Sequence, residues 1–390
     1  MSDRPSDRRT VAVIYGTRPE AIKMAPLVSG LRAHSGLDPV VVVTGQHREM
    51  LDQVNELFGI VPEHDLDLMV HGATLAELSS RALLDVSTLL QQIRPDAVVV
   101  QGDTSTAFVA GLAAFYQQIP VVHLEAGLRS GDITSPFPEE ANRRLVAPIT
   151  GLHLAPTATA RGNLIAEGIK PDVIATTGNT VIDALQEALR TPARFADPAV
   201  EELVTSGRRF ALVTAHRRES WGEPMRQAML ALRDIAEAEP DLALVVPMHR
   251  NPVVREVVRE VLAEVPGVLL TEPFDYHEFC HTMRAATIVI SDSGGVQEEA
   301  PSLGKPVLVM RENTERPEAV EAGTVRLVGT DRTTIRESAL TLLRNPAAYA
   351  EMAMATNPYG DGEAGPRAVA AVAHLLGVGH RLPDFSPRKD

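Results

Sequence analysis

Short β-branched runs alternate along the chain with longer segments of helical period, and this alternation limits the possible folds more than any other feature. Each run is a near-continuous apolar block of strand length, as expected for a strand that is covered on both faces. Segments with helical spacing of apolar residues lie between the runs, for example at 21–33, 75–93, 225–237 and 252–264. Strands that alternate with helices form parallel sheets through right-handed crossovers. The runs cover residues 10–15, 39–44, 97–101, 120–124, 210–214, 242–246, 268–271, 287–291 and 306–310.

The length of the chain favours two such domains, because 390 residues exceed what one hydrophobic core usually supports. A strand-like run at 173–177 ends in the turn residues Thr177-Gly-Asn, and a polar stretch with prolines follows at 191–207. We therefore predict an α/β fold with two doubly wound Rossmann-like domains, residues 1–178 and 179–363, and a cleft between them. A last apolar helix within 364–378 is expected to pack back on the first domain.

Composition and charge exclude several classes of protein. The net charge of −14 argues against an extended nucleic-acid surface, which needs clustered Lys and Arg. Cys280 is the only cysteine, so no intrachain disulfide or cysteine metal cage can form, and the histidines lack metal-binding spacings. Residues 1–9 are polar, and no apolar stretch approaches the ~18–20 residues that cross a bilayer. We expect a cytoplasmic protein with no metal and no membrane partner.

The segments that follow the predicted strands are the candidate ligand sites, because doubly wound folds bind ligands beyond the carboxyl ends of their strands. Gly16-Thr-Arg-Pro-Glu follows the first run, and Arg18 and Lys23 could face an anion at the start of the next helix. The alternative is that both cations lie on a solvated face. The Gly-x-Gly-x-x-Gly fingerprint is absent, which disfavours a nicotinamide dinucleotide.

Three carboxylates of the first half could handle protons. Asp103 follows the run at 97–101, although local sequence favours a helix N-cap there. Glu125 directly follows the run at 120–124, where desolvation suits proton abstraction. Glu139 and Glu140 lie in a segment bracketed by prolines that could fold over a cleft or simply start a helix, and these two readings are compatible.

The second half carries signals for a diphosphate. His216-Arg-Arg follows the run at 210–214, and three potential cations at a strand end suit a diphosphate leaving group. Ser293-Gly-Gly follows another strand and precedes a helix, so backbone N–H groups could approach phosphate, and Glu298 or Glu299 could accept from a ribose diol. A plain Gly-rich turn is the alternative. Arg316 adds a cation, whereas His249 could equally be a structural histidine.

Long, non-repetitive stretches between about residues 11 and 376 resemble the non-hydrolysing UDP-N-acetylglucosamine 2-epimerases. The resemblance is carried by Gly16-Thr-Arg-Pro-Glu-Ala-Ile-Lys-Met-Ala-Pro, Thr44-Gly-Gln-His-Arg-Glu-Met, Gly102-Asp-Thr, His123-Leu-Glu-Ala-Gly-Leu-Arg, Pro138-Glu-Glu-Ala-Asn-Arg, Thr177-Gly-Asn-Thr-Val-Ile-Asp-Ala-Leu, His216-Arg-Arg-Glu, Asp292-Ser-Gly-Gly-Val-Gln-Glu-Glu-Ala, Thr314-Glu-Arg-Pro-Glu-Ala and Asn357-Pro-Tyr-Gly-Asp-Gly.

The resemblance implies the two-domain glycosyltransferase-B fold, a homodimer and the interconversion of UDP-GlcNAc and UDP-ManNAc for cell-surface polysaccharide synthesis. It also implies the route, which is anti elimination of UDP to 2-acetamidoglucal followed by re-addition of UDP. This route requires no cofactor and no metal. Two faces of C2 need two groups that handle protons, so more than one carboxylate is required.

The resemblance also implies roles for individual residues. The acid and base carboxylates would be Asp103, Glu125 and Glu139, and which of them serves which face of C2 stays open. His216 would also be a catalytic residue, at the diphosphate. The residues that would contact the substrate, including the family's uracil contacts, are Arg18, Lys23, His216, Arg217, Phe274, Phe279, Ser293, Gly294, Gly295, Glu299 and Arg316.

Some members of the family bind a second, activating UDP-GlcNAc beside the active site. The matching residues here are Gln46, His47, Arg217 and His249. A further basic residue of that site would fall near 69–72, which reads Met-Val-His-Gly. The sequence therefore leaves allosteric activation open.

Three other functions share part of this evidence. A glycosyltransferase of the same fold would need an acceptor and no proton handling at C2. A hydrolysing relative would release free ManNAc, and a non-catalytic UDP-sugar sensor would have no use for the three carboxylates. The carboxylate set favours the epimerase.

Overall fold

The computed structural model describes residues 8–45, 48–68 and 72–387 and divides into two compact units. Unit 1 runs to Gln186 and resumes from Tyr359 to Pro387, and unit 2 comprises Glu187–Pro358. The change between units falls inside helix α7 (Thr180–Ala188), whereas the sequence prediction set it after residue 178. Each unit is described separately below.

Unit 1 is built on one parallel sheet of seven strands in the order β3-β2-β1-β4-β5-β6-β7. The strands are β1 (Arg9–Tyr15), β2 (Leu37–Val43), β3 (His64–Asp65), β4 (Ala97–Gln101), β5 (Val121–Leu124), β6 (Leu152–Ala155) and β7 (Ile174–Thr176). Every residue of β4 and β5 is buried, because helices cover both faces of the sheet.

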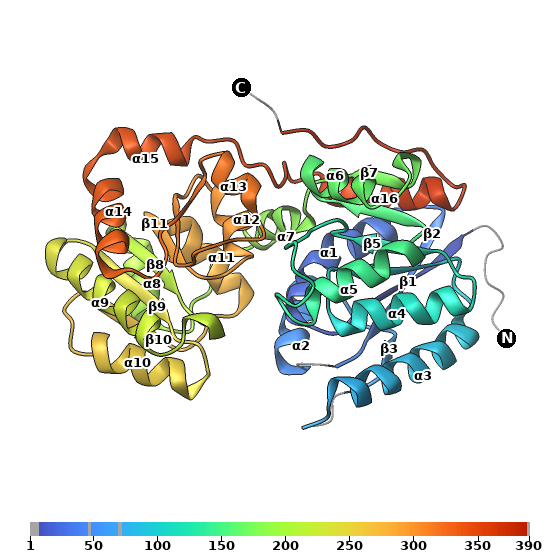
Figure 1. Ribbon diagram of the computed structural model, residues 1–390, viewed down its shortest axis with the longest axis horizontal. Coiled ribbons are helices and arrows are strands. Elements are labelled where there is room, and N and C mark those ends of the chain that lie inside the picture. Colours follow the sequence, from blue (N-terminus) through green and yellow to red (C-terminus); the bar gives the residue numbers. More distant parts are fainter. Residues whose placement is uncertain (1–7, 46–47, 69–71, 388–390) are drawn as a thin grey trace. The chain divides into compact units, whose positions relative to one another are not determined.

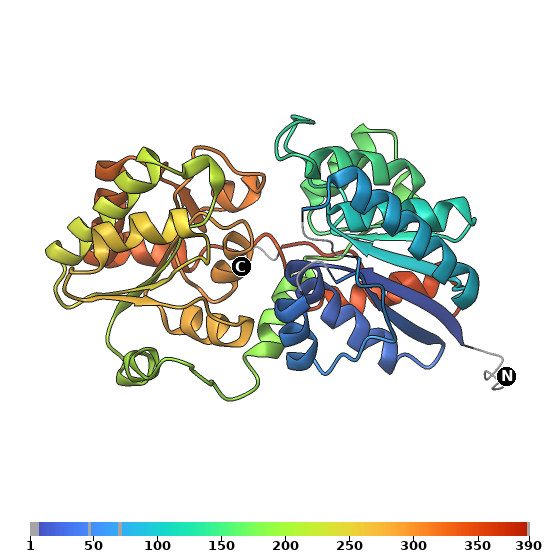
Figure 2. The same cartoon turned by 90° about the horizontal axis from the view of Figure 1, so that it is seen from below.

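Helices α3, α4 and α5 cover one face of this sheet, and α1 and α16 cover the other (Figures 1 and 2). Alternate side chains of the central strands, such as Ile14 and Val98, join α3 and α4 in one apolar core. The helical segments of unit 1 are α1 (Arg18–Ala33), α2 (Arg48–Leu57), α3 (Leu75–Ile93), α4 (Ser105–Tyr116), α5 (Glu139–Val146), the 3₁₀ turn η1 (Ala147–Ile149), α6 (Ala158–Ala166), the 3₁₀ turn η2 (Pro171–Val173), α7 and α16 (Ala364–Leu375).

The C-terminal helix α16 returns to unit 1, where it packs against α1 and β6. The buried carboxylate of Asp183 on α7 accepts hydrogen bonds from the backbone N–H groups of Ala364 (3.2 Å) and Gly365 (2.7 Å). A carboxylate at a helix N-terminus satisfies donors that the helix leaves unpaired. Asp183 therefore fixes the start of α16 on the first unit.

Unit 2 has a parallel sheet of six strands in the order β10-β9-β8-β11-β12-β13. The strands are β8 (Phe210–Thr214), β9 (Ala243–Pro247), β10 (Val268–Thr271), β11 (Ile288–Ser291), β12 (Val307–Val309) and β13 (Val325–Leu327). The helical segments are α8 (Pro198–Ser206), the 3₁₀ turn η3 (Arg218–Ser220), α9 (Glu223–Ala238), α10 (Pro252–Leu262), α11 (Tyr276–Ala285), α12 (Val296–Ser302), α13 (Pro317–Glu321), α14 (Arg332–Arg344) and α15 (Pro346–Ala353). Its main core joins α9, α10 and α14 to the sheet.

Both sheets share one strand order, in which the chain starts in the middle, runs to one edge and then crosses to the other side. The order reverses between β1 and β4 in unit 1 and between β8 and β11 in unit 2. Ligands of doubly wound folds bind at such switch points, beyond the carboxyl ends of the strands. Gly16 and Asp103 lie at the first point, and His216 and Ser293 lie at the second. Within the described ranges, no helix is long and apolar enough to cross a membrane.

Candidate active site

The end of β1 comes very close to the end of β2. A Cβ atom on Gly16 would lie 2.1 Å from Oγ1 of Thr44, so only glycine fits there. Helix α1 then begins at Arg18, and the buried Glu20 accepts from the backbone N–H groups of Gly16 (3.0 Å) and Thr17 (2.8 Å). Burial raises the pKa of Glu20, although these hydrogen bonds work against that shift. Glu20 therefore ties the strand end to the first turn of α1.

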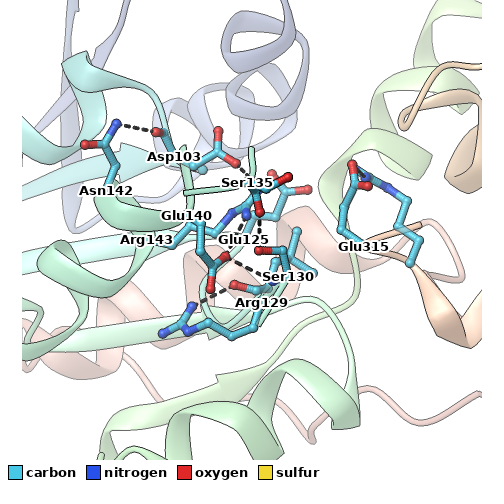
Figure 3. Close-up of polar contacts among 12 residues, drawn as sticks. Asp103, Glu125, Arg129, Ser130, Ser135, Glu140, Asn142, Arg143 and Glu315 are labelled. Carbon is cyan, nitrogen blue, oxygen red and sulfur yellow. Dashed lines mark hydrogen bonds and ion pairs between the residues drawn. The ribbon is translucent and has the colours of Figure 1, made fainter. Parts of the chain in front are cut away.

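Asp103 does not cap the helix that follows it, contrary to the reading that local sequence favoured. Thr104 is the N-cap of α4, where its Oγ1 accepts from the backbone N–H of Ala107 at 3.0 Å. The Asp103 carboxylate therefore does not bond to the first turn of α4 and can contact other residues. Its Oδ2 lies 2.6 Å from Nη2 of Arg143, and its backbone carbonyl accepts from Nδ2 of Asn142 at 2.8 Å (Figure 3).

Glu125 follows β5 with a left-handed backbone, at φ +64°. This conformation is strained for a residue other than glycine and is typical of functional sites. The residue is 9% exposed, and its carboxylate accepts hydrogen bonds from Lys23, Gln101 and Asn179, the last at 3.0 Å. Lys23 thus contacts the Glu125 carboxylate. This carboxylate is buried and is surrounded by three hydrogen-bond donors.

Helix α5 begins at Glu139, as one reading of the sequence predicted. Glu139 is partly exposed, and within the described ranges its side chain has no hydrogen-bonding or ionic partner. Glu140 is fully buried and accepts from the backbone N–H of Ser130 (3.0 Å), Arg143 (2.9 Å) and Arg144 (3.1 Å). Burial works in the opposite direction, yet these bonds lower the pKa of Glu140. The two adjacent glutamates therefore have different environments.

In unit 2, the buried Asp292 holds the segment after β8. Its Oδ2 accepts from the backbone N–H groups of His216 (2.7 Å) and Arg217 (2.8 Å), and its Oδ1 lies 2.8 Å from Nδ1 of His216. Burial alone would raise the pKa of Asp292, but the contacts with His216 and the two backbone donors lower it. Because Asp292 occupies Nδ1, Nε2 of His216 is the ring atom left for a ligand.

The Gly-rich segment after β11 lies against an arginine. A Cβ atom on Gly294 would come within 2.7 Å of Nη1 of Arg316, so a side chain at this position would displace the guanidinium. Arg316 is held by Glu298 (Nε to Oε1, 2.7 Å) and Glu315 (Nη1 to Oε1, 2.6 Å). The nearby arginines, including Arg217 at 3.6 Å from Glu315, lower the pKa of that carboxyl strongly. Arg316 is thus fixed beside Gly294, and Arg217 contacts the same Glu315 that holds Arg316.

The remaining predicted ligand residues of unit 2 lie on or near α11 and α12. Glu299 is buried and accepts from Oη of Tyr276 at 2.8 Å. Phe274 is buried just before α11, and Phe279 lies partly exposed on this helix. The proposed contacts of Phe274 and Phe279 with the uracil stay a prediction.

The proposed second-site residues are only partly described. Gln46 and His47 lie outside the described residues. The exposed ring of His249 stacks on His216, with ring centroids 5.8 Å apart. The described residues contain no group of three or more His, Cys, Asp and Glu that could hold a metal ion.

Sequence reasoning did not single out several residues that shape these sites. They are Gln101, Asn142, Arg143, Asn179, Tyr276 and Asp292. Asn142 and Arg143 follow Glu139 within one helical turn, so their position on the same helix was a usable signal. The contacts of Asp292 and Asn179 depend on strands and loops far apart in sequence and gave no such signal.

The fold and these two polar strand edges define the class of protein. Both units have parallel sheets in doubly wound order, with charged side chains at each switch point. This combination is the two-domain glycosyltransferase-B type of fold, as the sequence predicted.

The chain belongs to the UDP-N-acetylglucosamine 2-epimerase family, whose family model matches residues 29–373. It is 50% identical over 368 residues to UDP-N-acetylglucosamine 2-epimerase of Escherichia coli (strain K12), with 93% of this chain and 98% of that protein covered. It is 48% identical over 374 residues to UDP-N-acetylglucosamine 2-epimerase of Bacillus subtilis (strain 168), with 96% and 97% covered. The predicted resemblance to the bacterial, non-hydrolysing type is confirmed, and the chain is an enzyme of the isomerase class.

Solved structures of UDP-N-acetylglucosamine 2-epimerases have the same fold as this chain. UDP-GlcNAc 2-epimerase from Neisseria meningitidis bound to UDP-GlcNAc matches with a TM-score of 0.87 and 44% identity, covering 94% of this chain and 100% of that chain. An S. aureus structure with UDP matches with a TM-score of 0.90 and 44% identity, covering 97% and 100%. These matches confirm the predicted fold class.

Proposed function

We propose that this chain interconverts UDP-GlcNAc and UDP-ManNAc by elimination and re-addition of UDP. The names of its relatives support the substrate, since a structure 44% identical to this chain is described as bound to UDP-GlcNAc. The observation that carries the proposal is the set of carboxylates at neighbouring strand ends of unit 1. Asp103 follows β4 and Glu125 follows β5, and Glu139 starts α5.

The proposed reaction is balanced without an oxidant or reductant. A carboxylate removes the proton from C2, the C1–O bond breaks, and UDP departs with its electron pair as a C1=C2 double bond forms. UDP oxygen then attacks C1 of the 2-acetamidoglucal, and a carboxylic acid protonates C2 on the opposite face. Because each proton transfer needs a positioned group, two carboxylates are required.

Hydrogen-bond donors fix the carboxylates of Asp103 and Glu125, which supports the use of both as proton-handling groups. Glu125 accepts from Lys23, Gln101 and Asn179, and a Cβ atom on Gly102 would lie 3.5 Å from its Oε2. The Glu125 carboxylate therefore lies beside the residue that precedes Asp103. Such preorganised groups lower the barrier because they need no reorientation during the reaction.

Unit 2 supplies the proposed site for the UDP leaving group. His216 and Arg217 follow β8, Ser293, Gly294 and Gly295 follow β11, and Arg316 lies against Gly294. Cations and backbone N–H groups at this position would stabilise the charge that develops on the diphosphate. Glu299 would accept from the ribose, and Phe274 and Phe279 would contact the uracil. Arg18 and Lys23 are further proposed substrate contacts.

We further propose a homodimer, formed through the outer face of unit 1. Helices α3, α4 and α5 cover one face of its sheet (Figure 1), and large apolar side chains on these helices are exposed. They are Leu84 on α3 (68% exposed), Phe115 and Tyr116 on α4 (50% and 65%) and Leu145 on α5 (52%). Exposed apolar patches on one face favour protein association. Sedimentation velocity would test this, because the dimer should dissociate when Leu84 is replaced by Glu.

The cytoplasmic location, the use of the product for cell-surface polysaccharide and the second UDP-GlcNAc site remain parts of the proposal. His249 supports the second site only through its contact with His216, a proposed ligand residue. A dependence of the initial rate on UDP-GlcNAc that is sigmoidal would support activation by a second molecule.

Turnover with UDP-GlcNAc as the only added substrate tests the proposed function. The epimerase account predicts UDP-ManNAc at equilibrium with UDP-GlcNAc, and neither free ManNAc nor a need for an acceptor. Stoichiometric release of UDP and free sugar would support a hydrolase, and turnover only with an added acceptor would support a glycosyltransferase. Binding of UDP-GlcNAc without any turnover would support a non-catalytic UDP-sugar sensor.

A further inference from the structure

Helix α5 holds Asp103 at two points. Nδ2 of Asn142 donates to the Asp103 backbone carbonyl at 2.8 Å, and Nη2 of Arg143 lies 2.6 Å from its Oδ2 (Figure 3). The first contact fixes the position of the main chain after β4, and the second fixes the rotation of the carboxylate. An ion pair with good geometry at a partly buried position is stronger than one in water.

Arg143 is itself held in place. It is 6% exposed, and its second terminal nitrogen, Nη1, donates to Oε2 of Glu140 at 2.9 Å. Glu140 is fully buried and also accepts from the backbone N–H of Ser130 and from Arg144. The guanidinium therefore uses its two ends for two carboxylates, an arrangement that the single ammonium of lysine cannot reproduce.

The contacts from Ser130 to Glu140, from Glu140 to Arg143 and from Arg143 to Asp103 connect three parts of unit 1. Ser130 lies in the segment after β5, Glu140 and Arg143 lie on α5, and Asp103 lies after β4. Glu139, the first residue of α5, directly precedes Glu140 in the chain. The same short helix thus carries one proposed proton-handling carboxylate and the residues that hold another.

We infer that Arg143, anchored by Glu140, is a positioning residue that orients the Asp103 carboxylate for proton transfer at C2. This inference rests on the proposed function. Arg143 acts through Asp103, so its removal should lower the rate of proton transfer and leave nucleotide binding unchanged. A misplacement of about 1 Å at a reacting group can lower a rate about 100-fold.

The experiment compares Arg143→Gln and Arg143→Lys with Arg144→Gln as a matched control. Arg144 lies on the same helix and contacts the same Glu140, but no contact joins it to Asp103. We expect kcat for epimerisation to fall about 100-fold in Arg143→Gln. Arg143→Lys, which keeps the charge, should recover only part of the rate because lysine cannot reach both carboxylates. KM and the UDP dissociation constant should change less than about threefold, and Arg144→Gln should behave as wild type.

A double-mutant cycle separates positioning from a general structural role. If Arg143 acts through Asp103, Arg143→Gln should lower the residual rate of Asp103→Asn by less than about threefold. An unchanged kcat in Arg143→Gln, or an equal loss of rate in both backgrounds, would overturn the inference. Thermal melting identifies a variant that fails to fold. Glu140→Gln, which removes the charge and one acceptor oxygen of the anchor, then provides the comparison. It should lower kcat with the same KM, and wild-type kcat in this variant would also contradict the inference.

The proposed function can fail independently of this inference. If wild-type protein forms no UDP-ManNAc, the proposed function is wrong, and so is the positioning role that rests on it. If wild type is active and Arg143→Gln is equally active, the epimerase assignment stands and only the positioning role is wrong.

Discussion

Oδ1 of Asp292 lies 2.8 Å from Nδ1 of His216, and the other oxygen of the same carboxylate accepts from the backbone N–H groups of His216 and Arg217. One buried side chain thus fixes both the imidazole and the loop that carries it. The pair joins the carboxyl ends of β8 and β11, the strands that flank the switch point of unit 2. A carboxylate on Nδ1 sets the orientation of the ring and directs its other nitrogen, Nε2, away from Asp292.

Replacing Asp292 with Asn should weaken UDP binding about tenfold, because hydrogen bonds to charged groups contribute about 1.5–3 kcal/mol. Asparagine has one acceptor oxygen, so if that oxygen accepts from the two backbone N–H groups, its amide nitrogen takes the place of the oxygen that faces Nδ1 of His216. Isothermal titration calorimetry with UDP measures the effect. Asp331→Asn is a matched control, since Asp331 caps α14 in the same unit and Asn caps equally well. An unchanged affinity in Asp292→Asn would contradict the proposed role of His216.

Gly294→Ala should weaken UDP binding at least about tenfold without unfolding the protein. The added Cβ atom would come within 2.7 Å of Nη1 of Arg316, so the guanidinium must leave its place between Glu298 and Glu315. Loss of one charge-assisted contact has about this magnitude. Gly162→Ala, on helix α6 with no atom within 4 Å of its added Cβ, should bind UDP as wild type does. Equal affinities for both variants would remove Gly294 and Arg316 from the proposed site.

Glu125→Gln should keep UDP affinity within about threefold and lower kcat about 100-fold or more, as expected for loss of a proton-transfer group. The amide keeps the shape of the side chain but cannot take up a proton as a carboxylate does. Glu167→Gln serves as the control, because Glu167 pairs with Arg129 near the surface and has no proposed role. A Glu125→Gln variant with near-normal turnover would exclude Glu125 as a proton-handling group.

Two buried histidines should make the fold of unit 1 sensitive to acid. His123 on β5 and His153 on β6 are paired neighbours in the sheet, and burial lowers their pKa values to about 4 and about 3. Because the folded pKa values lie below the unfolded value of about 6.5, this stabilisation is complete above about pH 6.5 and is lost as the pH falls toward 4 and below. For His123 the loss amounts to about 3 kcal/mol, from about 1.4 kcal/mol per pKa unit.

Urea unfolding at a series of pH values, followed by a probe in unit 1, measures this loss. The His153→Leu variant should show a shallower decrease of the unfolding free energy below pH 6.5. Neither ring nitrogen of His153 has a hydrogen-bond partner in the described part of the chain, so leucine removes no such bond. His380→Leu changes an exposed histidine and should keep the wild-type pH dependence. A wild-type slope in His153→Leu would contradict the prediction.

The fold could be predicted from the sequence because both sheets are buried on both faces. Each apolar run predicted as a strand corresponds to a strand of the structure, from β1 at Arg9–Tyr15 to β12 at Val307–Val309. The strands that no predicted run covers are β3, β6 and β13. They contain two, four and three residues. Predicted strands such as β12 are equally short, so composition is the reason: β3 and β6 contain no β-branched residue, and the charged Arg326 interrupts β13.

For the candidate active site, local sequence was informative mainly about residues that directly follow a strand. The position of Glu125 behind β5 followed from local sequence, and so did the turn at Ser293. Local sequence was wrong about Asp103, because the neighbouring Thr104 caps α4 instead. The partners of Asp103 lie about 40 residues further along the chain. Such pairs depend on how α5 packs against the strand ends, which no local pattern encodes.

Deuterium transfer to C2 tests the central claim most directly. The protein is incubated with UDP-GlcNAc in D₂O, and the C2 position of both UDP-sugars is followed by NMR. Elimination and re-addition predict UDP-ManNAc that carries deuterium at C2, together with gradual exchange in the UDP-GlcNAc pool and transient 2-acetamidoglucal and UDP. UDP-ManNAc that keeps the original hydrogen at C2, or no epimer and no exchange at all, would contradict the account.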